Sequence, residues 1–136
     1  MTPNLIILHH SLTEDGKTVS WNAIRQYHLS KGWNGIGYHF GIELVGNRYE
    51  TLLGRLPTEI GAHCRGMNDA SLGICFVGNF DIEEPPGEQL IIGRQLVRSL
   101  MKVFGISKEM VKGHREYSSK TCPGIKFPLG EFIRGL

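Results

Sequence analysis

Leu5-Ile6-Ile7-Leu8-His9-His10 is a short, uninterrupted apolar run that ends in two histidines. Such a run is typical of a strand buried on both faces of a sheet, although its brevity is also compatible with a helix segment. We interpret it as a central strand. Since adjacent strand residues point to opposite faces, only one of His9 and His10 can face a given cleft, and spacing alone does not say which.

Patterns of helix and strand follow along the rest of the chain. Ser20 can cap a helix in which Trp21, Ile24 and Tyr27 recur at helical steps, and Gly32 can end it. A long helix is predicted from Pro86 to Gly105 and a short one within 129–134. Further strands are predicted at 38–44 and 48–52, which form a hairpin through Gly46-Asn47, and at 72–77 and 110–114.

Composition narrows the class of protein. A chain of 136 residues is one ordinary domain, so we expect a single domain over residues 1–136. A net charge of +2, with no basic stripe, argues against a nucleic-acid partner. The first residues lack a basic segment, and their apolar run is too short for a signal sequence or a membrane span, so we expect a protein that is cytoplasmic as synthesised and is not inserted into a membrane.

Three candidate metal ligands stand out. His114 and Cys122 lie eight residues apart, at the end of a predicted strand and in the loop after it, and one of the two N-terminal histidines can join them. Two imidazoles and a thiolate suit zinc, and three protein ligands leave a position open, as in catalytic sites. The alternative is that Cys122 is a buried apolar residue and the histidines are ordinary, because no HExxH or close CxxC signature is present.

Six ordered blocks of the sequence carry a family resemblance. They are Ile7-Leu8-His9-His10-Ser11, Gly37-Tyr38-His39-Phe40, Ile60-Gly61-Ala62-His63, Gly66-Met67-Asn68, Gly73-Ile74-Cys75-Phe76-Val77-Gly78-Asn79-Phe80, and His114 through Lys120-Thr121-Cys122-Pro123. In this order and spacing the chain resembles the zinc-dependent N-acetylmuramoyl-L-alanine amidases, the family shared by amidase-type phage lysozymes and peptidoglycan recognition proteins. The resemblance implies an α/β fold: a mixed central β-sheet of about five strands flanked by about three helices, in a single domain like that of the peptidoglycan recognition proteins.

The resemblance also implies roles for individual residues. It makes His9, His114 and Cys122 the zinc ligands, so that His10 faces away or packs. It places Tyr38 and Lys120 as catalytic groups, whereas without it a core tyrosine and a solvated lysine are the simpler interpretations.

Three further positions match residues that line the substrate groove in relatives. They are His39, His63 and Asn68. His39 alternates with Tyr38 along a strand, so it has a second interpretation as a buried histidine with satisfied hydrogen bonds. We interpret Cys64 and Cys75 as structural residues. The sequence does not decide whether they form a disulfide with each other.

The function implied is zinc-dependent hydrolysis of the amide between N-acetylmuramic acid and L-alanine in peptidoglycan, in a monomeric enzyme resembling an endolysin that reaches the cell wall after release. The general base stays unassigned, since Glu116 is the near acid in sequence but the chain runs away from it toward Cys122. The alternative is a non-catalytic module that binds peptidoglycan. Such members typically lack the cysteine ligand, so Cys122 favours the enzyme.

Overall fold

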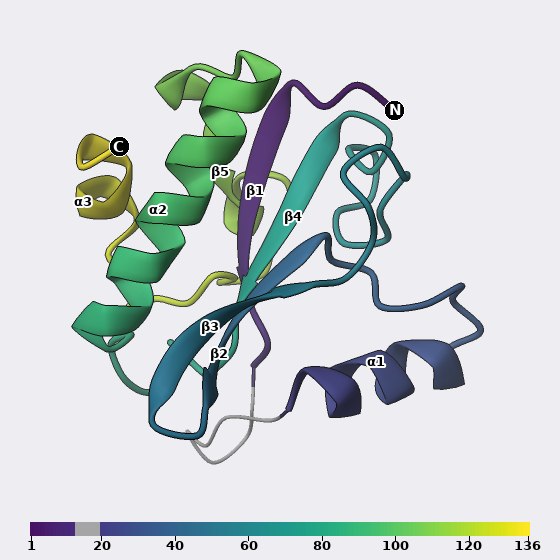
Figure 1. Ribbon diagram of the computed structural model, residues 1–136, viewed down its shortest axis with the longest axis horizontal. Coiled ribbons are helices and arrows are strands. Elements are labelled where there is room, and N and C mark those ends of the chain that lie inside the picture. The colour runs from purple at the N-terminus through teal and green to yellow at the C-terminus, as the bar shows by residue number, and fades with distance from the viewer. Residues whose placement is uncertain (13–19) are drawn as a thin grey trace.

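A five-stranded mixed sheet forms the centre of the computed structural model, which describes residues 1–12 and 20–136 (Figure 1). The strands are β1 (Leu5–His10), β2 (Phe40–Val45), β3 (Arg48–Leu53), β4 (Ser71–Phe76) and β5 (Val111–Gly113), arranged in the order β3-β2-β4-β1-β5. β1 pairs in parallel with both β4 and β5, and β4 pairs in parallel with β2. Only the hairpin of β2 and β3 is antiparallel, so the predicted mixed sheet is confirmed.

β1 occupies the interior position that its apolar run predicted. It has a hydrogen-bonded neighbour on each side, and all six of its residues are buried. Its side chains alternate between two cores. Ile6 and Leu8 pack in the larger core, whereas Leu5 and Ile7 pack on the opposite face against Cys64.

Three helices and two short 3-10 turns complete the described part of the chain. The helices are α1 (Trp21–Ser30), α2 (Gly87–Phe104) and α3 (Leu129–Arg134), and the 3-10 turns are η1 (Lys108–Met110) and η2 (His114–Glu116). Ser20 caps α1 by accepting a hydrogen bond from the Ala23 N–H at 3.1 Å, as predicted. Gly105 ends α2 with a left-handed φ of 66°, which glycine adopts without steric cost.

The helices divide between the two faces of the sheet (Figure 1). α2 and α3 lie side by side over one face, where Val97 and Phe132 pack with Phe76 of β4 in the larger core. α1 lies on the other side, and its Ile24 packs with Val77, just beyond β4. The face that carries α1 is also the face of Leu5 and Ile7, so the next odd-numbered residue of β1, His9, points to the same side.

A few boundaries differ from the sequence-based prediction. β2 begins at Phe40 rather than at residue 38, but the backbone before it keeps ladder-like bonds, since the Gly54 N–H donates to the His39 carbonyl at 2.8 Å. All three cysteines are free, so the disulfide left open between Cys64 and Cys75 does not form. No helix in the described part of the chain is long and apolar enough to cross a membrane.

Candidate metal centre

His9, His114 and Cys122 converge at the carboxyl ends of two neighbouring strands. β1 and β5 run parallel with Leu8 opposite Gly113, so His9 and His114 both follow directly after that pair. Their rings lie 4.6 Å apart between centroids, and Cys122 Sγ lies 3.6 Å from His9 Nδ1. The three potential ligand atoms all lie within 4.8 Å of one another, so this group could hold a metal ion.

Strand alternation selects His9 over His10. The His10 ring lies on the face of the larger core, where its Nδ1 accepts a hydrogen bond from the Phe80 N–H at 3.1 Å and its ring packs beside the Phe80 ring. His10 therefore packs away from the site, as the family resemblance implied. The His10 backbone still acts on the site, because it lowers the pKa of the Cys122 thiol.

Backbone and side-chain hydrogen bonds connect the loop that carries Cys122 to the rest of the fold. The Arg115 N–H donates to the Cys122 carbonyl at 2.7 Å, and the Cys122–Pro123 peptide bond is cis. Asp81, beyond β4, accepts from the Thr121 hydroxyl at 2.8 Å and from the Ile125 N–H at 2.9 Å. Asp81 thus holds the residues on both sides of Cys122. The sequence reasoning missed it, because no local pattern links residues 40 positions apart.

Burial keeps the candidate ligands uncharged while no metal is bound. It lowers the pKa of His9 well below the ordinary value, with further lowering by the nearby His63 and His114. It also lowers the pKa of His114, to which the positive charge of Lys120 adds. Burial raises the pKa of the Cys122 thiol to about 12, although the His10 backbone and Lys120 oppose this. At neutral pH both imidazoles can therefore bind a cation directly, whereas Cys122 has to release a proton.

Tyr38 and Lys120 both lie close to this group. The Tyr38 ring centroid is 5.1 Å from that of His9, and burial raises the pKa of the Tyr38 hydroxyl well above its ordinary value, with smaller contributions from Cys75 and Cys122. Tyr38 is therefore a protonated hydrogen-bond donor at any physiological pH. Lys120 is exposed, and its charge is felt at both His114 and Cys122.

The three positions expected to line a substrate groove are largely engaged within the protein. His39 is fully buried, its Nδ1 lies 3.0 Å from the Gly73 N–H, and its Nε2 lies 2.8 Å from the Glu59 carbonyl. His39 thus fits the second interpretation, a buried histidine with satisfied hydrogen bonds. Asn68 is half-buried, and its Oδ1 accepts from the backbone N–H groups of His63 and Cys64.

His63 contacts a candidate ligand rather than an open surface. It is buried, and its Nδ1 lies 2.9 Å from Nε2 of His9. Burial lowers the pKa of His63 to about 3, with His39 adding to the effect, so the ring is neutral. The resemblance had singled out His63, but nothing in the sequence reasoning connected it with His9, which is 54 residues away.

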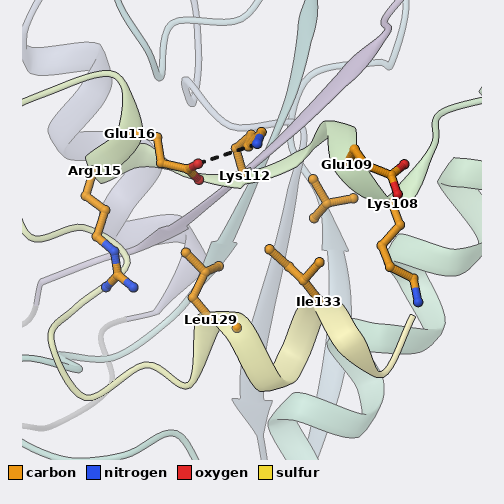
Figure 2. A pocket seen from close by; sticks show the side chains of 9 residues that line it. Lys108, Glu109, Lys112, Arg115, Glu116, Leu129 and Ile133 are labelled. Carbon is orange, nitrogen blue, oxygen red and sulfur yellow. Dashed lines mark ion pairs between the residues drawn. The ribbon is translucent and has the colours of Figure 1, made fainter.

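Glu116 is turned away from the candidate ligands. Its side chain lies in a pocket between η1, β5, η2 and α3, where it forms an ion pair with Lys112 at 3.6 Å (Figure 2). Its other oxygen accepts from the Gly113 N–H at 2.8 Å. Since none of the three candidate ligands lines this pocket, the structure gives Glu116 no role beside them.

Comparisons with known proteins identify the family of this chain. The family model described as N-acetylmuramoyl-L-alanine amidase matches residues 1–125. The endolysin of Enterobacteria phage T3 is 32% identical over 130 residues, which cover 91% of this chain and 82% of that protein. The endolysin of Escherichia phage T7 is 33% identical over 126 residues, 88% of this chain and 80% of that protein.

Among solved structures, the N-acetylmuramoyl-L-alanine amidase LysC from Clostridium intestinale superposes with a TM-score of 0.88 at 32% identity, covering 98% of this chain and 85% of that one. The fold and the family resemblance are thus confirmed. The chain belongs to the N-acetylmuramoyl-L-alanine amidase family and is an amidase that acts on peptidoglycan.

Proposed function

We propose that this amidase is zinc-dependent and that His9, His114 and Cys122 hold the zinc while it hydrolyses the amide between N-acetylmuramic acid and L-alanine. The observation that carries the proposal is the convergence of these three side chains within 4.8 Å. Two imidazoles and one thiolate are ligand types that zinc prefers, and a set of three leaves one position open.

The spacing of one pair of donor atoms fits a tetrahedral ion such as zinc. With Zn–S of about 2.3 Å and Zn–N of about 2.0–2.1 Å, a tetrahedral zinc holds a sulfur and a nitrogen ligand roughly 3.6 Å apart. Cys122 Sγ and His9 Nδ1 lie 3.6 Å apart. These two side chains therefore need little movement to bind the ion, so little of the binding free energy is lost to rearrangement.

A zinc ion held by these residues would supply Lewis-acid chemistry and a water activated for attack. The residues of the chain supply the rest. The Tyr38 hydroxyl keeps its proton and can donate a hydrogen bond to the oxygen that gains negative charge as the amide is attacked. Lys120, exposed at the rim of the group, can place its positive charge beside the same oxygen.

The substrate that we propose is the peptide-bearing glycan of the bacterial cell wall, with the protein acting as a monomer. The relatives support the choice of substrate, since four phage proteins among them are endolysins. A further structural relative, the peptidoglycan recognition protein LE, was solved with tracheal cytotoxin, a monomeric diaminopimelic acid-type peptidoglycan.

The roles of Tyr38 and Lys120 are tested by separating turnover from metal content. Tyr38→Phe and Lys120→Met are each expected to keep one zinc per chain while lowering turnover on peptidoglycan by about 100-fold, the usual loss when one donor to a developing charge is removed. The matched controls are Tyr27→Phe, at an exposed tyrosine on α1, and Lys102→Met, at an exposed lysine on α2. Turnover at the parent rate in either site variant contradicts its role.

A further inference from the structure

A chain of buried hydrogen bonds runs back from His9 into the protein. Nε2 of His9 lies 2.9 Å from Nδ1 of His63. On its other side, Nε2 of His63 lies 3.4 Å from the carbonyl oxygen and 3.4 Å from the hydroxyl oxygen of Ser71, the first residue of β4. The Ser71 hydroxyl in turn donates to the Met67 carbonyl at 2.6 Å.

The contacts of Ser71 determine which atoms donate and which accept in this series of hydrogen bonds. A carbonyl oxygen can only accept a hydrogen bond. The Ser71 hydroxyl has one proton, and it donates this proton to the Met67 carbonyl. Both oxygens that face Nε2 of His63 are therefore acceptors, so a neutral His63 carries its proton on Nε2. Its Nδ1 is then an acceptor, and the proton between the two histidines belongs to Nε2 of His9. Nδ1 of His9 is left with a free lone pair that faces Cys122.

Two glycines leave space for the His63 ring. A Cβ added to Gly73 of β4 would lie 2.5 Å from Cγ of His63, and one added to Gly61 would lie 2.6 Å from its Cδ2. The fully buried His39 ring packs edge-on at 5.7 Å between centroids. The His63 ring thus packs directly against two glycines and the His39 ring. This packing holds its Nδ1 toward His9.

We propose that His63 is a positioning residue that holds His9 with its proton on Nε2, so that Nδ1 of His9 is ready to bind the metal. The proposal rests on the proposed function in that it takes His9 as a metal ligand. It gives His63 a role behind the metal site rather than in the substrate groove. Partners of this kind commonly account for 10- to 100-fold in metal affinity.

Two variants of similar volume separate the hydrogen bond from the packing. Asn at position 63 offers an amide oxygen near the place of the imidazole Nδ1, whereas Leu has nearly the same shape and no acceptor. Zinc affinity, measured by competition with a chromophoric chelator, is expected to fall about 10- to 100-fold in His63→Leu and to stay near the parent value in His63→Asn. Parent-like affinity in His63→Leu overturns the proposal, and so does equal weakening in both variants, which would indicate a packing role.

A second measurement needs no metal. The ¹⁵N chemical shifts of the His9 ring in the metal-free protein report which nitrogen carries the proton. The parent and His63→Asn are expected to show the proton on Nε2 of His9, and His63→Leu a mixture or the opposite tautomer. A proton on Nδ1 in the metal-free parent overturns the proposal. If no variant binds zinc, the proposed function fails, yet the shifts still decide the role of His63.

Discussion

At the scale of single residues, the site depends on which side of a strand a histidine faces. His9 and His10 are neighbours in sequence and both are buried, but His9 lies among candidate ligands whereas His10 bonds the Phe80 N–H in the opposite core. This pair is a built-in comparison, because the same substitution can be made at two adjacent positions that differ in the face they occupy.

We predict that His9→Asn lowers zinc affinity by more than about 100-fold, since removal of a direct ligand should cost more than removal of an outer partner. His10→Asn should keep near-parent affinity, because an asparagine oxygen can still accept from the Phe80 N–H. The measurement is chelator competition on both folded variants. Loss of zinc in folded His10→Asn with retention in His9→Asn contradicts the assignment.

Cysteine substitutions test the third ligand in the same manner. Cys122→Ala is expected to lose more than about 100-fold in zinc affinity because the one sulfur ligand of the proposed set is removed. Cys64→Ala removes an equally buried free thiol from the packing around Leu5 and Ile7 and should keep its zinc. Zinc content after dialysis against a weak chelator distinguishes the two variants, and one retained zinc in Cys122→Ala at parent affinity excludes this cysteine as a ligand.

At the scale of elements, local periodicity predicted what depends on near neighbours. The apolar run at Leu5–Leu8 predicted β1, and Pro86 and Gly105 predicted the two ends of α2. The two-residue alternation of a strand did not tell which of His9 and His10 is the ligand. That depends on which face of the sheet α2 covers. The contacts of His63 with His9 and of Asp81 with Thr121 join residues that are 54 and 40 positions apart, so no local pattern could reveal them.

The packing of α2 on the sheet allows a prediction in which two effects oppose each other. Alanine is favoured over glycine within a helix by up to about 1 kcal/mol, but a Cβ at Gly93 would lie 2.5 Å from Cζ of Phe76. Overpacking of this kind costs about 1–3 kcal/mol, so Gly93→Ala should lower the free energy of unfolding. Gly87→Ala, at the first residue of α2 with no atom within 4 Å of the added Cβ, should leave it unchanged or slightly raised. Urea denaturation measures both variants, and a more stable Gly93→Ala contradicts the close packing.

At the scale of the whole molecule, the two faces of the sheet differ in what they carry. The larger core with α2 and α3 occupies one face, whereas the candidate ligands gather on the other, at the ends of β1 and β5. All six histidines of the chain lie in buried or half-buried positions. Burial lowers the pKa of every one of them.

This shared shift predicts a loss of stability in acid. In the unfolded chain the imidazoles take up protons near pH 6.5, but in the folded chain burial lowers the pKa of His28 to about 4 and that of His63 to about 3. Between these values the unfolded state binds more protons, so the free energy of unfolding falls as the pH drops from about 7 to 4. His28 therefore contributes stability that is present above about pH 6.5 and is lost progressively as the pH falls toward 4.

Denaturation of the metal-free protein at several pH values checks this expectation. In His28→Asn, where the amide oxygen can still accept from the Gly37 N–H, the loss between pH 7 and 4 should be smaller than in the parent. An unfolding free energy that is constant over this range contradicts the burial of neutral histidines in the fold.

The central claim is that this protein cuts peptidoglycan with a metal held by His9, His114 and Cys122. Its most direct test is to incubate the protein with purified peptidoglycan, with and without a zinc chelator, and to identify the new chain ends by mass spectrometry. We predict the release of stem peptides that begin with free L-alanine, abolished by the chelator and restored by added zinc. Binding to peptidoglycan without new ends, or release of the same peptides at full rate in the metal-free protein, would contradict the claim.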